Sequence, residues 1–278
     1  MTDVALVTGG SRGIGRGISL ALAEAGMAVA VNYRNDEDAA GAVVEQILSG
    51  GGRATAHRGD VSDAVGARAV VSEVRTRQGR VDVLVNNVGE FSLSRLSATS
   101  DDRWHDVLES NLGSAFYTAK AALPGMRQRH YGRIVNIGLS PARSVRGAPN
   151  LAPYTIAKTG IVILTRSLAT EEARFGITVN CVSPGLIDNG HLPAEQEQWM
   201  RKRVPSGRLG LPRDVAAAVV FLVSDLAGYI SGANLAVSGG WDWEDRPTDH
   251  DGEVTELFRD ASDGRGTDVP LPAPDTST

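Results

Sequence analysis

The chain has 278 residues, which is enough for one large α/β domain or two small ones. Its formal net charge of −5 provides no broad positive field, so nucleic acid is not expected as a partner. Cys181 is the single cysteine, which excludes an intrachain disulfide and fits a reducing, cytoplasmic setting. The histidines stand at no metal-ligand spacing, and neither a signal-peptide pattern nor a membrane-spanning apolar stretch occurs. A bound metal and a membrane partner are therefore not expected.

Short apolar runs alternate with longer stretches of helical period through most of the chain. The expected strands lie at 4–8, 28–32, 54–57, 83–86, 134–137, 178–182 and 234–237. The expected helices lie at 13–26, 36–49, 63–78, 101–129, 153–175 and 212–223. Several strands are apolar on both faces, as strands covered by helices on two sides must be. The pattern predicts an α/β fold over residues 1–245: a single doubly wound Rossmann-type domain, with a mainly seven-stranded parallel sheet and helices on both faces.

Residues 246–278 break this alternation. They are rich in Asp, Pro, Thr and Gly, and show one short apolar cluster at 254–258. So little apolar surface does not offset the entropy of ordering, which favours a flexible acidic tail. The alternative is an arm that packs on a neighbouring subunit through Leu257 and Phe258.

A glycine-rich segment, Thr8-Gly-Gly-Ser-Arg-Gly-Ile-Gly15, follows the first strand and opens the first helix. Glycines at this place let the chain turn sharply and let a pyrophosphate approach the amides of a helix N-terminus. Three glycines alone often mark only a loop. The strand before them and the amphipathic helix after them favour a dinucleotide-binding turn.

Further motifs occur in order along the chain: Asp60-Val61, Asn86-Asn87-Val88-Gly89, Asn111, Tyr154-Thr-Ile-Ala-Lys158 and Pro184-Gly185. With the glycine-rich turn, the ordered set resembles the short-chain dehydrogenase/reductase family over residues 3–243. Within that family it is most similar to ketoacyl-carrier-protein reductases and polyketide-type ketoreductases. The resemblance implies a nicotinamide cofactor held by Gly9, Ser11, Arg12, Gly13, Ile14, Gly15, Arg34, Asp60, Val61, Asn87, Gly89, Tyr154, Lys158, Pro184, Gly185 and Ile187.

The resemblance also assigns places around the adenosine. Asp60 is expected to hold the adenine amino group, with Val61 beside the ring, and Asn87 to lie near the ribose. Gly89 is expected to admit the cofactor. From the residues alone, Asp60 also suits a helix cap, and Asn86 and Asn87, at a buried strand end, need partners for their amides.

The end of the second expected strand indicates which nicotinamide cofactor is bound. It reads Asn32-Tyr33-Arg34 and lacks the carboxylate that pairs with the 2′-hydroxyl of NAD. Arg34 and Arg12 instead suit a 2′-phosphate, because guanidinium donors match its charge and geometry. Either arginine alone fits a solvated surface residue, but the two together predict NADPH/NADP rather than NAD.

Tyr154 and Lys158 share one face of a helix that Pro153 is suited to begin. A phenol with an ordinary pKa near ~10 is a poor acid–base catalyst at neutral pH, and a nearby ammonium lowers that pKa. Such a pair is common on amphipathic helices, but lysine is scarce in this chain. The resemblance implies that Tyr154 protonates the carbonyl oxygen and that Lys158 binds the nicotinamide ribose.

Two further catalytic candidates are Asn111 and Ser140. In the family, an Asn at the first place holds, through its backbone carbonyl, a water that links the lysine to solvent; the alternative is an exposed polar helix residue. The family's serine follows Ile-Gly at the end of the fifth strand, where this chain has Leu139. Ser140 replaces the family's serine at the substrate oxygen if the loop is reshaped, and is otherwise a turn residue. Ser144 is a poorer candidate for the same role.

The segment after Pro184-Gly185 is expected to lie against the nicotinamide. The resemblance places the backbone near Ile187 at its carboxamide, with Asn189 available to bond the cofactor. Residues 188–204 are expected to form a substrate lid, with apolar surface supplied by His191, Leu192, Trp199 and Met200, although packing alone explains each of these. Cys181 is expected to be a buried apolar residue rather than a nucleophile.

The leading hypothesis is NADPH-dependent reduction of a ketone to a secondary alcohol, in acyl or polyketide-type metabolism. The helices at 101–129 and 153–175 resemble those that build the family's tetramer interface, so a homotetramer is expected. One alternative is an NAD(P)-dependent alcohol dehydrogenase working in the oxidative direction. Another is a cofactor-binding sensor or assembly protein with impaired turnover, which Leu139 favours and which the Tyr154–Lys158 pair argues against.

Overall fold

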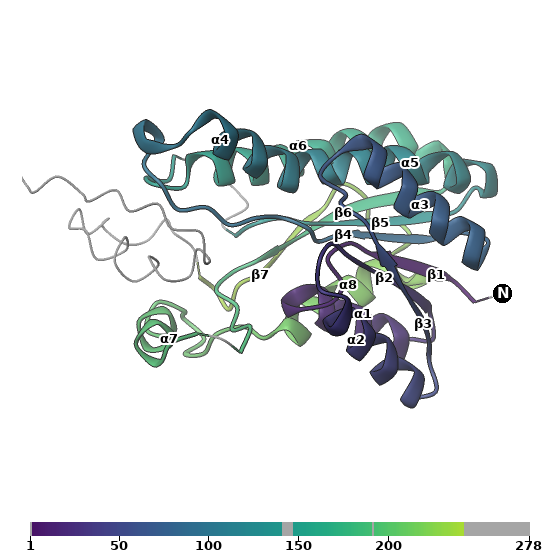
Figure 1. The fold of residues 1–278 in the computed structure, drawn as a ribbon, viewed down its shortest axis with the longest axis horizontal. Coiled ribbons are helices and arrows are strands. Elements are labelled where there is room, and N and C mark those ends of the chain that lie inside the picture. The colour runs from purple at the N-terminus through teal and green to yellow at the C-terminus, as the bar shows by residue number, and fades with distance from the viewer. Residues whose placement is uncertain (1, 141–146, 191, 242–278) are drawn as a thin grey trace, which may run out of the picture.

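The structure, a computed structural model, describes residues 2–140, 147–190 and 192–241 (Figure 1). The predicted tail at 246–278 and the candidates Ser144 and His191 lie outside these described residues. No helix in the described part of the chain is long and apolar enough to cross a bilayer.

The strands form one parallel sheet in the order β3-β2-β1-β4-β5-β6-β7. They are β1 Val4–Val7, β2 Ala28–Tyr33, β3 Arg53–Arg58, β4 Val83–Asn86, β5 Gly132–Ile137, β6 Ile177–Pro184 and β7 Asn234–Val237. The chain runs outward from β1 to β3 and then returns to β4 on the other side of β1. This reversal is the topological switch point at which doubly wound sheets bind ligands. The predicted fold class is confirmed.

Helices cover both faces of the sheet (Figure 1). One face carries α1 Gly13–Glu24, α2 Glu37–Ser49 and α8 Pro212–Val223; the other carries α3 Ala64–Gln78, α4 Asp101–Leu108, α5 Ser114–Arg129 and α6 Ala152–Glu172. Adjacent residues of β1 serve opposite layers: Val7 packs with Ile18 and Leu222, whereas Leu6 packs with Met126. Successive side chains point to opposite faces of a strand, so a strand between two helical layers is apolar throughout.

Two elements differ from the expected pattern. The predicted helix at 101–129 is interrupted by a π-helical turn, η2 Glu109–Gly113, which places Asn111 in a local widening of the helix. Helix α7 Ala194–Arg201 was not expected, because its eight residues carry no apolar period. Short 3-10 turns lie at Leu96–Ala98, Ala173–Phe175 and Asp225–Ala227.

Polar side chains at the ends of β4 and β5 form a buried hydrogen-bond chain. Asn86 Nδ2 donates to Asn136 Oδ1 at 2.8 Å, and Asn136 Nδ2 donates to Thr165 Oγ1 at 2.9 Å. Thr118 Oγ1 donates to Asn86 Oδ1 at 2.7 Å. The four residues are at most 5% exposed. The chain joins the sheet to α5 and α6 and so fixes where α6 begins relative to the strand ends.

Candidate active site

The glycine-rich turn joins β1 to α1 at the switch point. Gly9 and Gly13 have φ values of 59° and 52°, which side chains with a Cβ rarely adopt. A Cβ on Gly15 would stand 2.1 Å from the Gly9 carbonyl oxygen, so the turn requires glycine there. The first turn of α1 carries no acidic side chain. The helix N-terminus therefore suits an anionic group such as a pyrophosphate.

Two asparagines hold this turn in place. Gly9 N donates to Asn32 Oδ1 at 3.3 Å, and Gly10 N donates to the Asn32 carbonyl at 2.9 Å. Asn87 Nδ2 donates to the carbonyls of Thr8 and Gly9 at 3.1 and 3.2 Å. The structural role of Asn32 was not expected. The feature of the sequence that could have indicated it is a single amide side chain in an otherwise apolar strand. The place of Asn87 beside a ribose stays a prediction.

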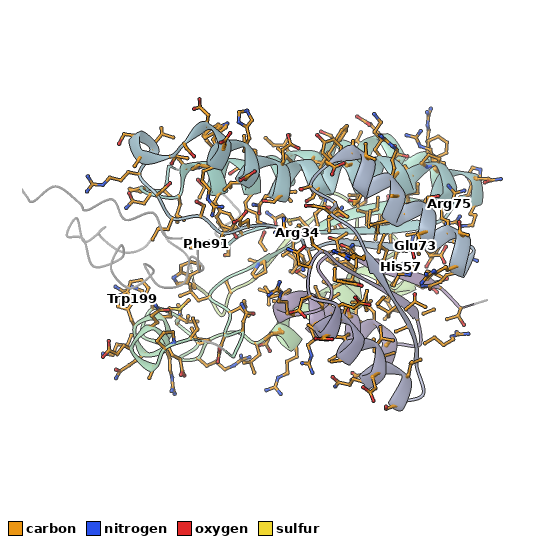
Figure 2. All side chains as sticks on the ribbon, viewed as in Figure 1. Arg34, His57, Glu73, Arg75, Phe91 and Trp199 are labelled. Carbon is orange, nitrogen blue, oxygen red and sulfur yellow. The ribbon has the colours of Figure 1, made fainter. Side chains whose placement is uncertain are left out.

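Arg34 and Asp60 form an ion pair at the adenosine end of the predicted site. Arg34 Nη1 lies 3.4 Å from Asp60 Oδ2, and the side chains are 60% and 40% exposed (Arg34 in Figure 2). Desolvation acts to raise the pKa of Asp60, but hydrogen bonds from Ser62 and the charge of Arg34 outweigh it and lower the pKa. Arg12 is exposed at the N-cap position of α1. Both predicted phosphate ligands therefore reach solvent near the turn.

The alternative role of Asp60 as a helix cap is wrong. Asp63 caps α3, because its Oδ1 accepts from Val65 N at 2.7 Å and from Gly66 N at 2.9 Å. Asp60 Oδ1 instead accepts from the backbone and hydroxyl of Ser62, at 2.9 and 2.6 Å, before the helix begins.

Tyr154 and Lys158 lie on the first turns of α6, which begins with Pro153 in its first turn as predicted. Lys158 Nζ is 5.7 Å from the centroid of the Tyr154 ring and donates to the Ile137 carbonyl at 2.8 Å. Lys158 is 6% exposed, and Tyr154 is partly exposed. The pair thus stands at the carboxyl end of β5, near the switch point.

Burial shifts the pKa of each titratable group here toward its neutral form. Desolvation raises the pKa of Tyr154 to about 12 and lowers the pKa of Lys158 to about 8, a shift that Cys181 partly opposes. The pKa of Cys181 itself rises to about 11, mainly through burial. At neutral pH the phenol therefore keeps its proton. The direction of the shift is opposite to the lowering predicted from the nearby ammonium, because desolvation raises the pKa of Tyr154.

Gly89 brings the loop after β4 against Lys158 and Asn111. A Cβ on Gly89 would stand 2.2 Å from Asn111 Oδ1 and 3.2 Å from Lys158 Nζ. Asn111 is 1% exposed, so the alternative of an exposed helix residue is wrong. Its Nδ2 donates to the carbonyls of Glu90 and Val107, both at 2.9 Å, whereas Oδ1 has no hydrogen-bond partner within the described residues. An unpaired buried acceptor beside a lysine marks a place for a water or a ligand.

Ser140 is anchored on the β6 side of the strand ends. Its backbone N donates to the Pro184 carbonyl at 2.9 Å, and its Oγ lies 3.5 Å from the carbonyl of Trp241. Ser140 is 2% exposed, whereas Leu139 is partly exposed. The buried position is unlike that of a solvated turn residue, and a catalytic role for Ser140 stays a prediction.

The loop after β6 returns to the glycine-rich turn. Ile187 pairs with Gly210 in an isolated bridge, and a Cβ on Gly13 would stand 3.3 Å from Asn189 Oδ1. The segment that follows Gly185 therefore lies beside the N-terminus of α1. This position would allow the segment to contact a cofactor bound at the glycine-rich turn.

Helix α7 lies in the predicted lid. Met200, Val204 and Leu209 are buried in an apolar cluster to which Leu186, Leu192, Trp199 and Trp241 add partly buried surface. The Arg203 guanidinium lies 3.4 Å from the centroid of the Trp199 ring. Packing accounts for Met200, which is 6% exposed, and a lid function stays a prediction.

The structure adds Phe91 to the residues near Tyr154. The two rings meet edge to face, with centroids 5.2 Å apart and planes at 73°. The sequence alone does not single out Phe91; the available signal is an aromatic residue directly after the Asn-Asn-Val-Gly motif in a chain with few aromatics.

The fold and the site define a class of protein. A glycine-rich turn at the switch point of a doubly wound sheet is the arrangement of dinucleotide-binding proteins. A phenol and a buried lysine beside that turn supply a proton donor and a positive charge, as an oxidoreductase acting on a carbonyl or an alcohol requires.

Comparisons with known proteins agree with this class. A family model described as enoyl-(acyl carrier protein) reductase matches residues 9–242. The 3-oxoacyl-[acyl-carrier-protein] reductase FabG of Staphylococcus aureus (strain Mu50) is 42% identical over 243 residues, covering 86% of this chain and 98% of that protein. The acetoacetyl-CoA reductase of Shinella zoogloeoides is 40% identical over 244 residues, covering 86% and 98%.

A crystal structure of a protein assigned as a short-chain alcohol dehydrogenase from Sinorhizobium meliloti 1021 has a TM-score of 0.81 at 34% identity, covering 87% of this chain and 97% of that one. The chain belongs to the short-chain dehydrogenase/reductase family of oxidoreductases, as the sequence predicts. Membership implies a nicotinamide cofactor.

The lowered pKa of Lys158 is expected to make stability depend on pH. A lysine that titrates at about 8 when folded, against an ordinary 10.5, binds fewer protons in the folded chain over that interval, so stability rises with pH there. Relative to Lys158→Met, the wild type should gain about 2 kcal/mol of unfolding free energy between pH ~7 and ~10. Urea unfolding of both proteins across this range measures the gain.

Lys202→Met is the matched control, because Lys202 is exposed. Its difference from the wild type should stay flat with pH. A flat difference for Lys158→Met as well would contradict the burial of Lys158 in the folded chain.

Proposed function

We propose that this chain uses NADPH to reduce a ketone to a secondary alcohol in acyl or polyketide-type metabolism. The observation that carries the proposal is the phenol of Tyr154 beside buried Lys158, at the sheet edge that holds the glycine-rich turn. The names of the relatives, 3-oxoacyl-[acyl-carrier-protein] reductase and acetoacetyl-CoA reductase, support a ketone as substrate.

The residues present fit a nicotinamide dinucleotide. The glycine-rich turn leads into α1, whose first turn carries no acidic side chain, so this helix N-terminus suits a pyrophosphate. A Cβ on Gly89 would clash with Asn111 Oδ1, so glycine is what lets the loop after β4 approach Lys158 and Asn111. Arg12 and Arg34 are exposed at the adenosine end and suit a 2′-phosphate. When bound, the reduced nicotinamide supplies a hydride to the carbonyl carbon.

In the proposed reaction Tyr154 Oη donates its proton to the carbonyl oxygen, while the carbon gains hydride, so the C=O double bond becomes an alcohol. A pKa of about 12 in the free chain keeps the phenol protonated until it is needed. The ammonium of Lys158 stabilises the phenolate that remains. We infer that the proton is restored through Lys158 and a water near Asn111, where an acceptor lacks a partner within the described residues.

The oxidative direction is the second candidate. The same groups run in reverse when Tyr154 is deprotonated, and one structural neighbour is assigned as an alcohol dehydrogenase. A sensor without turnover has weaker support, because Lys158 and Asn111 meet at Gly89 and Tyr154 lies beside Lys158.

We also propose that the chain works as a cytoplasmic homotetramer, the single cysteine supporting a reducing compartment. Large apolar side chains are exposed on α5 and α6: Phe116 at 43%, Ile156 at 50% and Ile163 at 62%. Exposed apolar side chains on one face of a helical layer are typical of subunit interfaces.

Replacing the proton donor should remove turnover without removing cofactor binding. Tyr154→Phe is expected to lower kcat for reduction of ethyl acetoacetate by about 100-fold or more, since the variant has no proton to donate. NADPH absorbance reports turnover, and NADPH fluorescence reports binding. Tyr229→Phe, at an exposed tyrosine, should match the wild type. A wild type that binds NADPH but reduces no ketone in a panel would point to the sensor, and turnover only of alcohols with NADP would point to the oxidative enzyme.

The cofactor preference should depend on Arg12 and Arg34. Arg34→Ala and Arg12→Ala are each expected to lower kcat/KM for NADPH by about tenfold, because a charge-assisted hydrogen bond is lost, and to leave kcat/KM for NADH unchanged. Arg53→Ala is the control, since Arg53 lies at the opposite end of β3 from this site. Equal wild-type kcat/KM values for the two cofactors would refute the NADPH assignment.

The role of Ser140 is open to a direct test. If its hydroxyl polarises the substrate carbonyl, Ser140→Ala should lower kcat by about 30-fold or more, as loss of an oxyanion donor does. Adding Leu139→Ser in that background should restore part of the rate if position 139 faces the substrate. An unchanged kcat in Ser140→Ala removes Ser140 from the site.

A further inference from the structure

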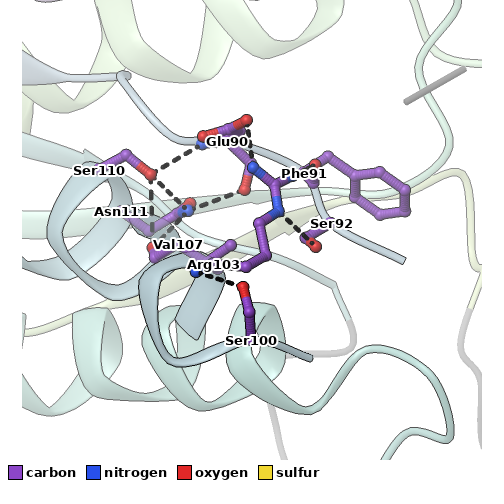
Figure 3. Close-up of polar contacts among 8 residues, drawn as sticks. All are labelled: Glu90, Phe91, Ser92, Ser100, Arg103, Val107, Ser110 and Asn111. Atoms are coloured by element: carbon purple, nitrogen blue, oxygen red, sulfur yellow. Dashed lines mark hydrogen bonds and ion pairs between the residues drawn. The ribbon is translucent and has the colours of Figure 1, made fainter. Parts of the chain in front are cut away.

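The loop that follows β4 is held by one arginine of α4. Arg103 Nη1 lies 2.5 Å from Glu90 Oε1, Nε donates to Ser92 Oγ at 3.1 Å, and Nη2 donates to the Phe91 carbonyl at 3.3 Å (Figure 3). The backbone N of Arg103 donates to Ser100 Oγ, the cap of the same helix, at 3.2 Å. A single guanidinium thus binds three consecutive residues.

The other side of the same loop is held by η2. Asn111 Nδ2 donates to the Glu90 carbonyl at 2.9 Å, and Glu90 N donates to Ser110 Oγ at 3.4 Å (Figure 3). Phe91, between these attachments, therefore has its backbone fixed from two helical segments. Its ring projects away from the polar groups in Figure 3 and meets Tyr154 edge to face.

Stability alone is a poor explanation for this arrangement. Arg103 is 32% exposed and Glu90 is 44% exposed, and ion pairs so accessible to water contribute little to folding. The planar guanidinium has a fixed fork of donors, so binding three acceptors fixes direction more than it adds stability. These contacts of Arg103 instead fix the position of Phe91 against Tyr154.

We propose that Phe91 is a specificity-determining residue, which favours ketones with an apolar substituent beside the carbonyl, and that Arg103 is the positioning residue that holds it. The proposal rests on the proposed function, because it takes Tyr154 as the proton donor. A substrate oxygen that accepts a hydrogen bond from Tyr154 Oη brings the substituents of its carbonyl carbon close to Phe91, whose ring centroid is 5.2 Å from that of Tyr154.

The chemistry of Phe91 defines the substituent. Its ring is 40% exposed and apolar, so an alkyl group that covers it is favoured over a polar one. Trp199, which α7 contributes to the apolar cluster of the predicted lid, lies on the same side of Figure 2 as Phe91. The inferred preference is therefore for a ketone whose carbonyl carbon carries an alkyl chain longer than methyl.

The test compares two ketones that share an ester and differ only in the alkyl group: ethyl acetoacetate, with methyl, and ethyl 3-oxohexanoate, with propyl. The wild type is expected to have the higher kcat/KM for the propyl ketone. Phe91→Ala should lower that preference by about tenfold, as removal of an apolar contact with a small alkyl chain does. Phe91→Leu keeps apolar volume and should retain most of the preference, and KM for NADPH should stay unchanged in both variants.

Arg103 is tested through its effect on Phe91. Arg103→Met should lower the same preference by about threefold, and should add nothing further in the Phe91→Ala background, because coupled residues are non-additive. Arg103→Lys keeps the positive charge but lacks the planar set of donors, so its preference for the propyl ketone should lie between those of the wild type and Arg103→Met. Arg95→Met is the matched control: Arg95 is exposed in the same loop, and its side chain makes no hydrogen bond or ion pair within the described residues.

The outcomes separate the two proposals. If the wild type reduces both ketones and Phe91→Ala leaves their kcat/KM ratio unchanged, the specificity role is overturned and the proposed function stands. Equal losses for both ketones with a lower melting temperature indicate a purely structural role and also overturn it. A wild type that reduces no ketone overturns both proposals.

Discussion

Lys158 carries an ammonium group into the interior, and a buried charge is stable only when neighbouring groups compensate for lost water. The Ile137 carbonyl accepts from it at 2.8 Å, and Gly89, with no side chain, lies close beside it. The contacts of Lys158 with Ile137 and Gly89 both depend on how α6 is placed against β4 and β5. The buried amides of Asn86 and Asn136 set that placement, because they tie the two strands to each other and to the helices on this face.

The π-helical turn connects this core to the surface loop beside the phenol. Its Asn111 uses Nδ2 to hold the loop after β4, while its Oδ1 lies against Gly89, as Lys158 Nζ does. A regular helix would present a different face at this position, since the extra residue of a π turn rotates the residues around it. One amide thus couples the proton-handling groups to the loop that carries Phe91. Arg103 completes the attachment from α4.

At the other end of the site, the glycine-rich turn is contacted by residues at or just after the ends of three strands. Asn32 of β2 and Asn87 after β4 hydrogen-bond its backbone, and the loop after β6 brings Asn189 against Gly13. Parallel strands end at one edge of the sheet, so groups distant in sequence meet there. The electrostatics divide accordingly: exposed Arg12 and Arg34 lie near the glycine-rich turn, and the buried ammonium of Lys158 lies beside Tyr154.

The sequence by itself determined the sheet, the glycine-rich turn and the shared face of Tyr154 and Lys158, because apolar period and four-residue spacing are local properties of the chain. The tertiary structure alone decided that Asp63 rather than Asp60 caps α3, and that Asn111 is buried. It also decided that Phe91 meets Tyr154. These features depend on contacts between segments far apart in the chain, and no local pattern encodes how the helices and loops pack over the strand ends.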